Sequence, residues 1–165
     1  MAYEAIAATT LGSTGTVTFS SISAGYEHLQ LRVFARGSGG SAATNLQIRL
    51  NNDSNTNYAR HRLTSDGATA STSSDTGATV IDAGRIAAST ATSNIFGVSI
   101  IEILDYASSN KYKTVRTIGG NDRNGSGDAV FHSGLWLSTS AVTQIDVVTS
   151  CVAGSVFALY GLKSA

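Results

Sequence analysis

The stretch HLQLRVFAR (residues 28–36) alternates apolar and polar side chains along most of its length. In an extended chain, this period of two places Leu29, Leu31 and Val33 on one face and the polar side chains on the other. The stretch NLQIRL (residues 45–50) repeats the pattern after GSGGS (residues 37–41), which is a turn signal. We therefore predict that residues 28–36 and 45–50 pair as a hairpin in an antiparallel sheet with one solvated face.

Further strand patterns fill the rest of the chain. Residues 95–104 (IFGVSIIEIL) are apolar enough to predict a strand that is buried on both faces for part of its length. A turn at residues 105–110 should return the chain into a partner strand at residues 111–119, and a second turn is expected at residues 121–128. The remaining expected strands are residues 58–64, 129–137, 144–148 and 155–162.

Seventeen glycines and no proline allow many tight turns without interrupting a strand. Short strands with regular turn signals predict one all-β domain over residues 1–165, an antiparallel β-sandwich of the jelly-roll type. Residues 1–13 are a candidate N-terminal arm. Residues 65–78, rich in Ser, Thr, Gly and Ala, predict an exposed loop, either an interface element or a surface excursion.

Composition restricts the possible functions. Hydrophobic residues make up 42% of the chain and charged residues only 13%, so the expected surface is hydrated but weakly charged, which suits contacts with other subunits. The formal net charge is +0, without the basic excess that nucleic-acid binding needs. No apolar run is long enough to insert into a bilayer, and the first residues do not resemble a signal peptide. We expect synthesis in a cytoplasm, no nucleic-acid binding and no insertion into a membrane.

Histidine and cysteine give no sign of a metal or nucleophile site. His28, His61 and His132 show no ligand spacing and fall in expected strands. The single Cys151 lies in an apolar stretch and is expected to be a small core residue. No phosphate-binding loop or nucleophile elbow is present in the sequence.

Two acidic features need separate treatment. Glu102 lies inside an apolar strand, where it is either a general acid or, as we favour, the partner of Lys113 or Arg116 across the turn. The alternating polar residues of 122–128 resemble a calcium loop, but the flanking helices and the last glutamate are missing, so a hairpin turn is expected. The sequence therefore predicts no catalytic, cofactor or metal residue and no enzyme.

Aromatic side chains are the remaining candidates for a binding site. Trp136 should point away from Leu135 and Leu137, and core packing is expected for it in preference to a ligand platform. The tyrosines that would serve such a platform are Tyr58, Tyr106, Tyr112 and Tyr160.

Several phrases occur in an order that resembles a group of small virion proteins of tailed bacteriophages, cyanophages among them. They are HLQLR (28–32), IRLNND (48–53), ILDY (103–106), NKYKTVR (110–116), SGLW (133–136) and FALYGL (157–162). The resemblance covers about residues 25–162. It implies a β-sandwich, a place in the virion and commonly a homotrimer, and it transfers no catalytic residue.

Within a virion we expect a capsid decoration, or cement, protein on the outer surface of the head, where trimers bridge neighbouring major capsid proteins. The alternative is a tail-fibre, tail-tip or baseplate domain that binds a host-surface glycan. A third possibility, a carbohydrate-active enzyme, requires Glu102, Asp105, Asp122 and Asp128 to converge in one groove.

Overall fold

The computed structural model describes residues 2–163, which form twelve β-strands and no helix. The strands are β1 (Ala2–Thr10), β2 (Gly15–Phe19), β3 (His28–Ala35), β4 (Ala43–Leu50), β5 (Tyr58–Ser65), β6 (Ala70–Ala78), β7 (Ile81–Ala87), β8 (Gly97–Leu104), β9 (Lys113–Asp122), β10 (Gly127–Trp136), β11 (Ile145–Cys151) and β12 (Val156–Lys163). They make an eight-stranded sheet, β1-β12-β3-β8-β9-β10-β5-β6, and a four-stranded sheet, β2-β11-β4-β7. The neighbouring strands are antiparallel, which confirms the predicted β-sandwich.

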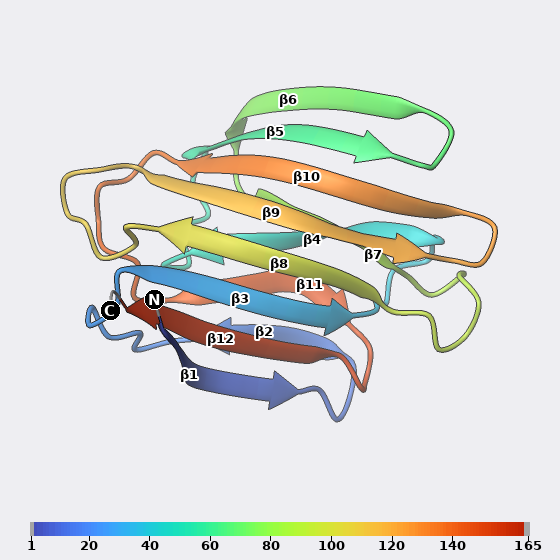
Figure 1. Cartoon of the computed structure of the whole chain (residues 1–165), viewed down its shortest axis with the longest axis horizontal. Coiled ribbons are helices and arrows are strands. Elements are labelled where there is room, and N and C mark those ends of the chain that lie inside the picture. Colours follow the sequence, from blue (N-terminus) through green and yellow to red (C-terminus); the bar gives the residue numbers. More distant parts are fainter. Residues whose placement is uncertain (1, 164–165) are drawn as a thin grey trace.

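Eight of these strands follow jelly-roll order. When the hairpins β5–β6 and β9–β10 are set aside, eight strands remain, in the orders β1-β12-β3-β8 and β2-β11-β4-β7. If these eight strands are renumbered from 1 to 8 along the chain, the two orders become 1-8-3-6 and 2-7-4-5. This order results when a long hairpin wraps into two layers, so that β1 pairs with β12, β2 with β11, β3 with β8 and β4 with β7. The two inserted hairpins continue the larger sheet beyond β8 (Figure 1).

The prediction that residues 28–36 and 45–50 form a hairpin is wrong. β3 lies between β12 and β8 in the larger sheet, whereas β4 lies between β11 and β7 in the smaller one. Alternation specifies which face of a strand is buried but not which strand lies beside it. The glycine-rich connection at residues 37–41 therefore carries the chain from one sheet to the other.

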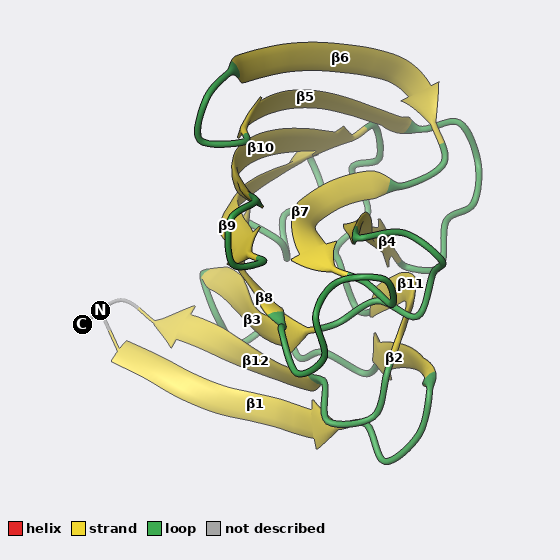
Figure 2. Cartoon of the chain, turned by 90° about the vertical axis from the view of Figure 1, so that its right-hand side faces the viewer, coloured by secondary structure: helices red, strands yellow, loops and turns green. Residues whose placement is uncertain are grey.

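The core lies between the two sheets, which face each other in Figure 2. As predicted, Leu29, Leu31 and Val33 are buried, and β4 contributes its own buried face opposite them. On β10, Gly134 permits close approach of the layers, because a Cβ there would lie 2.5 Å from Ile81 Cγ2. The alternating strands thus meet through their apolar faces.

Both edges of the larger sheet differ from the predicted irregular segments. Of the predicted 65–78 loop, only residues 66–69 form a connection, and β6 pairs along β5. Serine and threonine tolerate extended backbone, so an exposed edge strand can lack an apolar pattern. Residues 2–10 of the candidate arm form β1, which pairs with β12 and is mostly exposed.

The two predicted turns in the second half of the chain are confirmed. Residues 105–112 connect β8 to β9, and residues 123–126 connect β9 to β10. β8, however, alternates buried and exposed residues instead of being buried on both faces. Its exposed apolar side chains leave part of the larger sheet's outer surface uncovered.

Candidate functional site

The outer face of the eight-stranded sheet, meaning the side away from the smaller sheet, carries a row of apolar side chains. Cross-strand pairing places Leu63 (β5) opposite Phe131 (β10), Phe131 opposite Ile118 (β9) and Ile118 opposite Ile100 (β8). All four side chains are 45–61% exposed. Directly paired residues on one face of a sheet contact each other, so these four form one continuous strip, called the apolar row below.

A second apolar strip runs beside the first on the same face, two residues away along β8, where Val98 replaces Ile100. Val98 (β8) pairs with Phe34 (β3), which pairs with Val156 (β12). Phe96, just before β8, stacks on Phe34 with ring centroids 5.0 Å apart. This second row continues the apolar surface toward β12.

A polar row borders the apolar row on its other side. Arg116 (β9) pairs with Glu102 (β8), and Arg116 Nε donates to Glu102 Oε2 at 2.9 Å. Gln30 (β3) donates to the same glutamate from the next strand. The prediction that Glu102 forms an ion pair with Arg116 is thereby confirmed, and both of its carboxylate oxygens have a partner.

Such an uncovered surface is unusual for a protein that works alone. Single exposed apolar side chains are common, but contiguous patches mark interaction sites. An apolar centre bordered by charged and polar groups is also the arrangement found in protein interfaces. The outer face therefore has the chemistry to bind another protein.

The sequence-predicted histidines do not converge. His28 lies near Asp105 at the end of β8, His61 is on the exposed face of β5, and His132 is buried on β10. Among residues 2–163, no group of three or more His, Cys, Asp or Glu side chains is arranged to hold a metal ion. Cys151 is fully buried, as predicted, and burial raises the pKa of its thiol to about 11.

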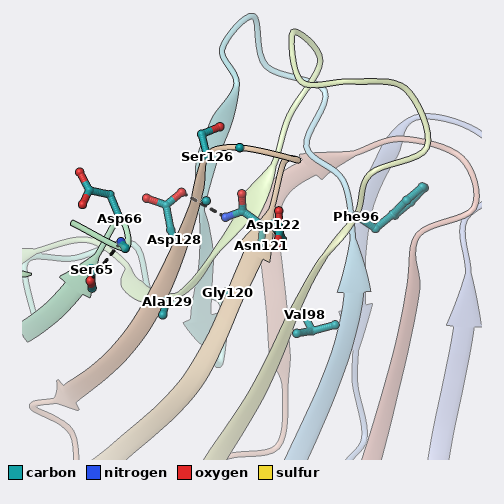
Figure 3. Close-up of a pocket in the computed structure, with 13 residues that line it drawn as sticks. Ser65, Asp66, Phe96, Val98, Gly120, Asn121, Asp122, Ser126, Asp128 and Ala129 are labelled. Carbon is teal, nitrogen blue, oxygen red and sulfur yellow. Dashed lines mark hydrogen bonds between the residues drawn. The ribbon is translucent and has the colours of Figure 1, made fainter. Parts of the chain in front are cut away.

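The carboxylates that an enzyme would need are also separated. Asp105 follows β8 at one end of the sheet, whereas Asp122 and Asp128 border the β9–β10 turn at the other end. Asp128 Oδ2 lies 2.6 Å from Arg123 Nη1. The same oxygen accepts a hydrogen bond from Asn121 Nδ2, which is drawn as a dashed line in Figure 3. The expected hairpin turn at residues 121–128 is confirmed.

The aromatic candidates are mainly structural. Trp136 is buried, as predicted, and its Nε1 donates to Asp53 Oδ2 at 2.8 Å. Tyr58 and Tyr106 are fully buried, Tyr160 is half-buried, and Tyr112 is exposed on the β8–β9 connection. These side chains do not form a common platform.

The apolar row was missed at the sequence level because each strand contributes only one exposed apolar residue to it. A sequence signal exists: in residues 98–104, apolar side chains occur at both even and odd positions, and Ile118 shares its parity in β9 with the polar Thr114 and Arg116. Only the cross-strand register aligns them.

No protein-family model, curated protein or solved structure matches this chain. Within residues 2–163, no helix has the length and apolar character needed to cross a membrane.

Proposed function

We propose that this protein is a structural subunit of a bacteriophage virion, a decoration (cement) protein of the capsid. In this proposal it forms a homotrimer on the outer surface of the head and bridges neighbouring major capsid proteins. It has no catalytic role. The observation that carries the proposal is the uncovered apolar row on the outer face.

We assign the outer face to contacts between copies of the chain within the trimer. The two apolar rows cross six strands, which at about 4.8 Å spacing extend about 25 Å. The exposed apolar side chains of the two rows and the polar row beside them together form the apolar-centre, polar-rim arrangement of subunit interfaces. A surface of this size and polarity fits a stable subunit contact.

The resemblance of several sequence phrases to small virion proteins supports a place in a particle, and a weakly charged surface suits a densely packed shell. Repeated weak contacts from a symmetric trimer would add to strong attachment. Capsids that carry the protein should then resist heat better than capsids assembled without it.

The test is cryo-electron microscopy of purified particles, with the copies of the protein counted. Trimers spread over the head surface would support the proposal. A few copies confined to the tail would overturn it in favour of host-surface recognition, and absence from particles would overturn both assignments. Unchanged heat resistance of particles lacking the protein would contradict the cement role.

A further inference from the structure

An open trough, shown in Figure 3, lies beside the apolar row on the outer face of the larger sheet and has a volume of about 630 Å³. Its floor is a cross-strand row of small residues, each paired with the next: Gly120 (β9), Ala129 (β10) and Ser65 (β5). A Cβ on Gly120 would lie 2.4 Å from the carbonyl oxygen of Asp128. No side chain can therefore fill the floor at that position without moving the backbone.

The rim of the trough is acidic. Asp66 and Asp122 line it, and neither takes part in an ion pair within residues 2–163. The third carboxylate of the lining, Asp128, already has two arginine partners that do not line the trough, Arg85 at 3.1 Å and Arg123 at 2.6 Å. A cation that reaches this rim meets two carboxylates without a partner.

The other half of the same cross-strand row carries bulky side chains, called the bulky half below. Phe34 (β3) pairs with Val156 (β12), and the two residues are 48% and 37% exposed. Phe34 also stacks on Phe96, with ring centroids 5.0 Å apart. The row thus has large apolar side chains over β12, β3 and β8 but small ones over β9, β10 and β5.

Arg32 adds a fixed positive charge to the bulky half, two residues before Phe34 on the same face. Its guanidinium carbon lies 5.2 Å from the ring centroid of Tyr3 and 4.9 Å from that of Tyr160. Arg32 Nε donates to Gln30 Oε1 at 2.8 Å. Two aromatic rings and one amide hold the guanidinium in place. In the part of the chain that the structure describes, no carboxylate forms an ion pair with it.

We propose that the bulky half of one copy packs into the trough of the next copy, with Phe34 over Gly120 and Arg32 paired with Asp122. Residues two apart on a strand point to the same face and lie about 7 Å from each other. Because both strands present their two residues at this spacing, both contacts form together when β3 of one copy lies over β9 of the next in the opposite direction. The inference rests on the proposed function, which assigns the outer face to contacts between copies.

The complementary charges cannot pair within one copy. Arg32 pairs across the strands with Ile100, and Ile100 pairs with Ile118, which lies four residues before Asp122 on β9. Two strand spacings and four residues separate the charges by about 17 Å. Each copy then uses two different surfaces of one face, as a cyclic trimer requires.

The test is a series of charge reversals in the full chain, with association measured by sedimentation velocity over a dilution series. Arg32→Glu and Asp122→Lys should each raise the concentration for half-dissociation at least about tenfold, because each brings like charges together. The double variant restores opposite charges and should return to near the wild-type value. The matched control is Arg49→Glu, which makes the same change of charge on β4 in the smaller sheet and should leave association unchanged.

A variant without a change of charge tests the trough itself. Ala129→Trp adds a large side chain to the exposed floor, so it should weaken association by a similar factor. Unchanged association in this variant, or a double charge variant that does not recover, would overturn the inference.

Failure of this contact can be distinguished from failure of the trimer. If the wild type associates and Ile118→Lys dissociates it, but these variants associate normally, the contact between trough and bulky half is wrong and the trimer stands. A wild type that is monomeric at all concentrations would overturn both, and the trough would then be free for a different protein.

Discussion

At the residue scale, Asp53 ties the turn after β4 to the end of β10. Its carboxylate accepts hydrogen bonds from Trp136 Nε1, Asn57 Nδ2 and the backbone and side chain of Asn55. Partial burial acts to raise the pKa of Asp53, but these hydrogen bonds outweigh it and lower the pKa from 3.8 to about 2. The carboxylate form is therefore the one that holds the turn.

Asp53→Asn should remove a pH-dependent part of the stability. The folded carboxyl has the lower pKa, so the folded state binds this proton less tightly than the unfolded chain. The stabilisation is complete above about pH 4 and is lost as the pH falls to about 2, amounting to at most about 2 kcal/mol. Urea unfolding of both proteins at several pH values measures this. Equal pH slopes in the two proteins over that window would contradict the assignment.

Lys113 holds two connections together from a buried position. Its Nζ donates to the carbonyl oxygens of Ser108 and Lys111, both at 2.7 Å, and of Thr139 at 3.2 Å. Burial lowers the pKa of this ammonium group. It thus supplies donors to the β8–β9 connection and to the segment after β10.

Lys113→Met should destabilise the fold by about 2–3 kcal/mol, because three carbonyl oxygens lose their donor. Lys111→Met is the matched control, since that side chain is exposed and its pair with Asp105 lies at the surface. We expect less than about 1 kcal/mol for the control. Chemical denaturation measures the free energy of unfolding of both variants. An equal decrease in the two would show that the buried contacts of Lys113 stabilise the fold no more than the surface pair of Lys111 does.

Sequence patterns at this scale predicted faces well. Leu29, Leu31 and Val33 are buried together as predicted, and the face of Trp136 was predicted from its leucine neighbours. Asp53 and Lys113 could not be identified in this way. Their roles depend on residues as far away as Trp136, and no local pattern encodes such a contact.

At the element scale, the inserted β5–β6 hairpin is attached to the smaller sheet by a buried carboxylate. Asp82 on β7 has a side chain with no exposed surface and accepts from Arg60 Nη1 at 2.9 Å and Arg62 Nη1 at 2.6 Å. Gln47 on β4 donates to it as well, at 2.9 Å. The polar inner side of the hairpin is thus satisfied by one residue of the opposite layer.

Asp82→Asn should loosen this hairpin. The substitution leaves two guanidinium groups without their buried anion, and breaking a buried pair costs about 3–5 kcal/mol. Hydrogen exchange should become faster in β5 and β6 before it does in β3 and β12. Asp75→Asn is the control, because Asp75 pairs with the same arginines but is 34% exposed, and we expect a smaller effect. Uniform acceleration in all strands would refute a local attachment.

The same hairpin shows that the pairing of strands could not be predicted from the sequence. Residues 65–78 lack any apolar alternation, so β6 is specified by its pairing with β5 and not by its own pattern. Likewise, the alternation of β3 and β4 is the same whether they pair or face each other across the core. Partner choice is a property of the whole wrapped chain.

At the scale of the whole molecule, jelly-roll wrapping combined with two insertions explains why an apolar surface is left uncovered. Within residues 2–163, the smaller sheet packs on the inner face of the larger one, and no further layer covers the outer face. The apolar row runs from the inserted β5 across β10 and β9 to β8, so the insertions supply three of its four residues. The insertions therefore turn the outer side of a small jelly roll into a broad binding face.

Ile118→Lys tests whether this face holds the trimer together. Ile118 is the most exposed member of the apolar row, at 61%, and its burial in a subunit contact is worth about 1.5–3 kcal/mol. A charge in its place adds a desolvation cost, so the concentration for half-dissociation should rise at least about 100-fold. Sedimentation velocity over a dilution series measures this concentration.

The matched control is Thr114→Lys, on the same strand and the same face but outside the apolar rows, and it should leave assembly unchanged. Because Ile118 contributes little to the monomer core, the unfolding midpoint of the isolated subunit should stay the same in both variants. A wild-type protein that is monomeric at all concentrations, or an Ile118→Lys variant that assembles normally, would remove the outer face from the trimer contact.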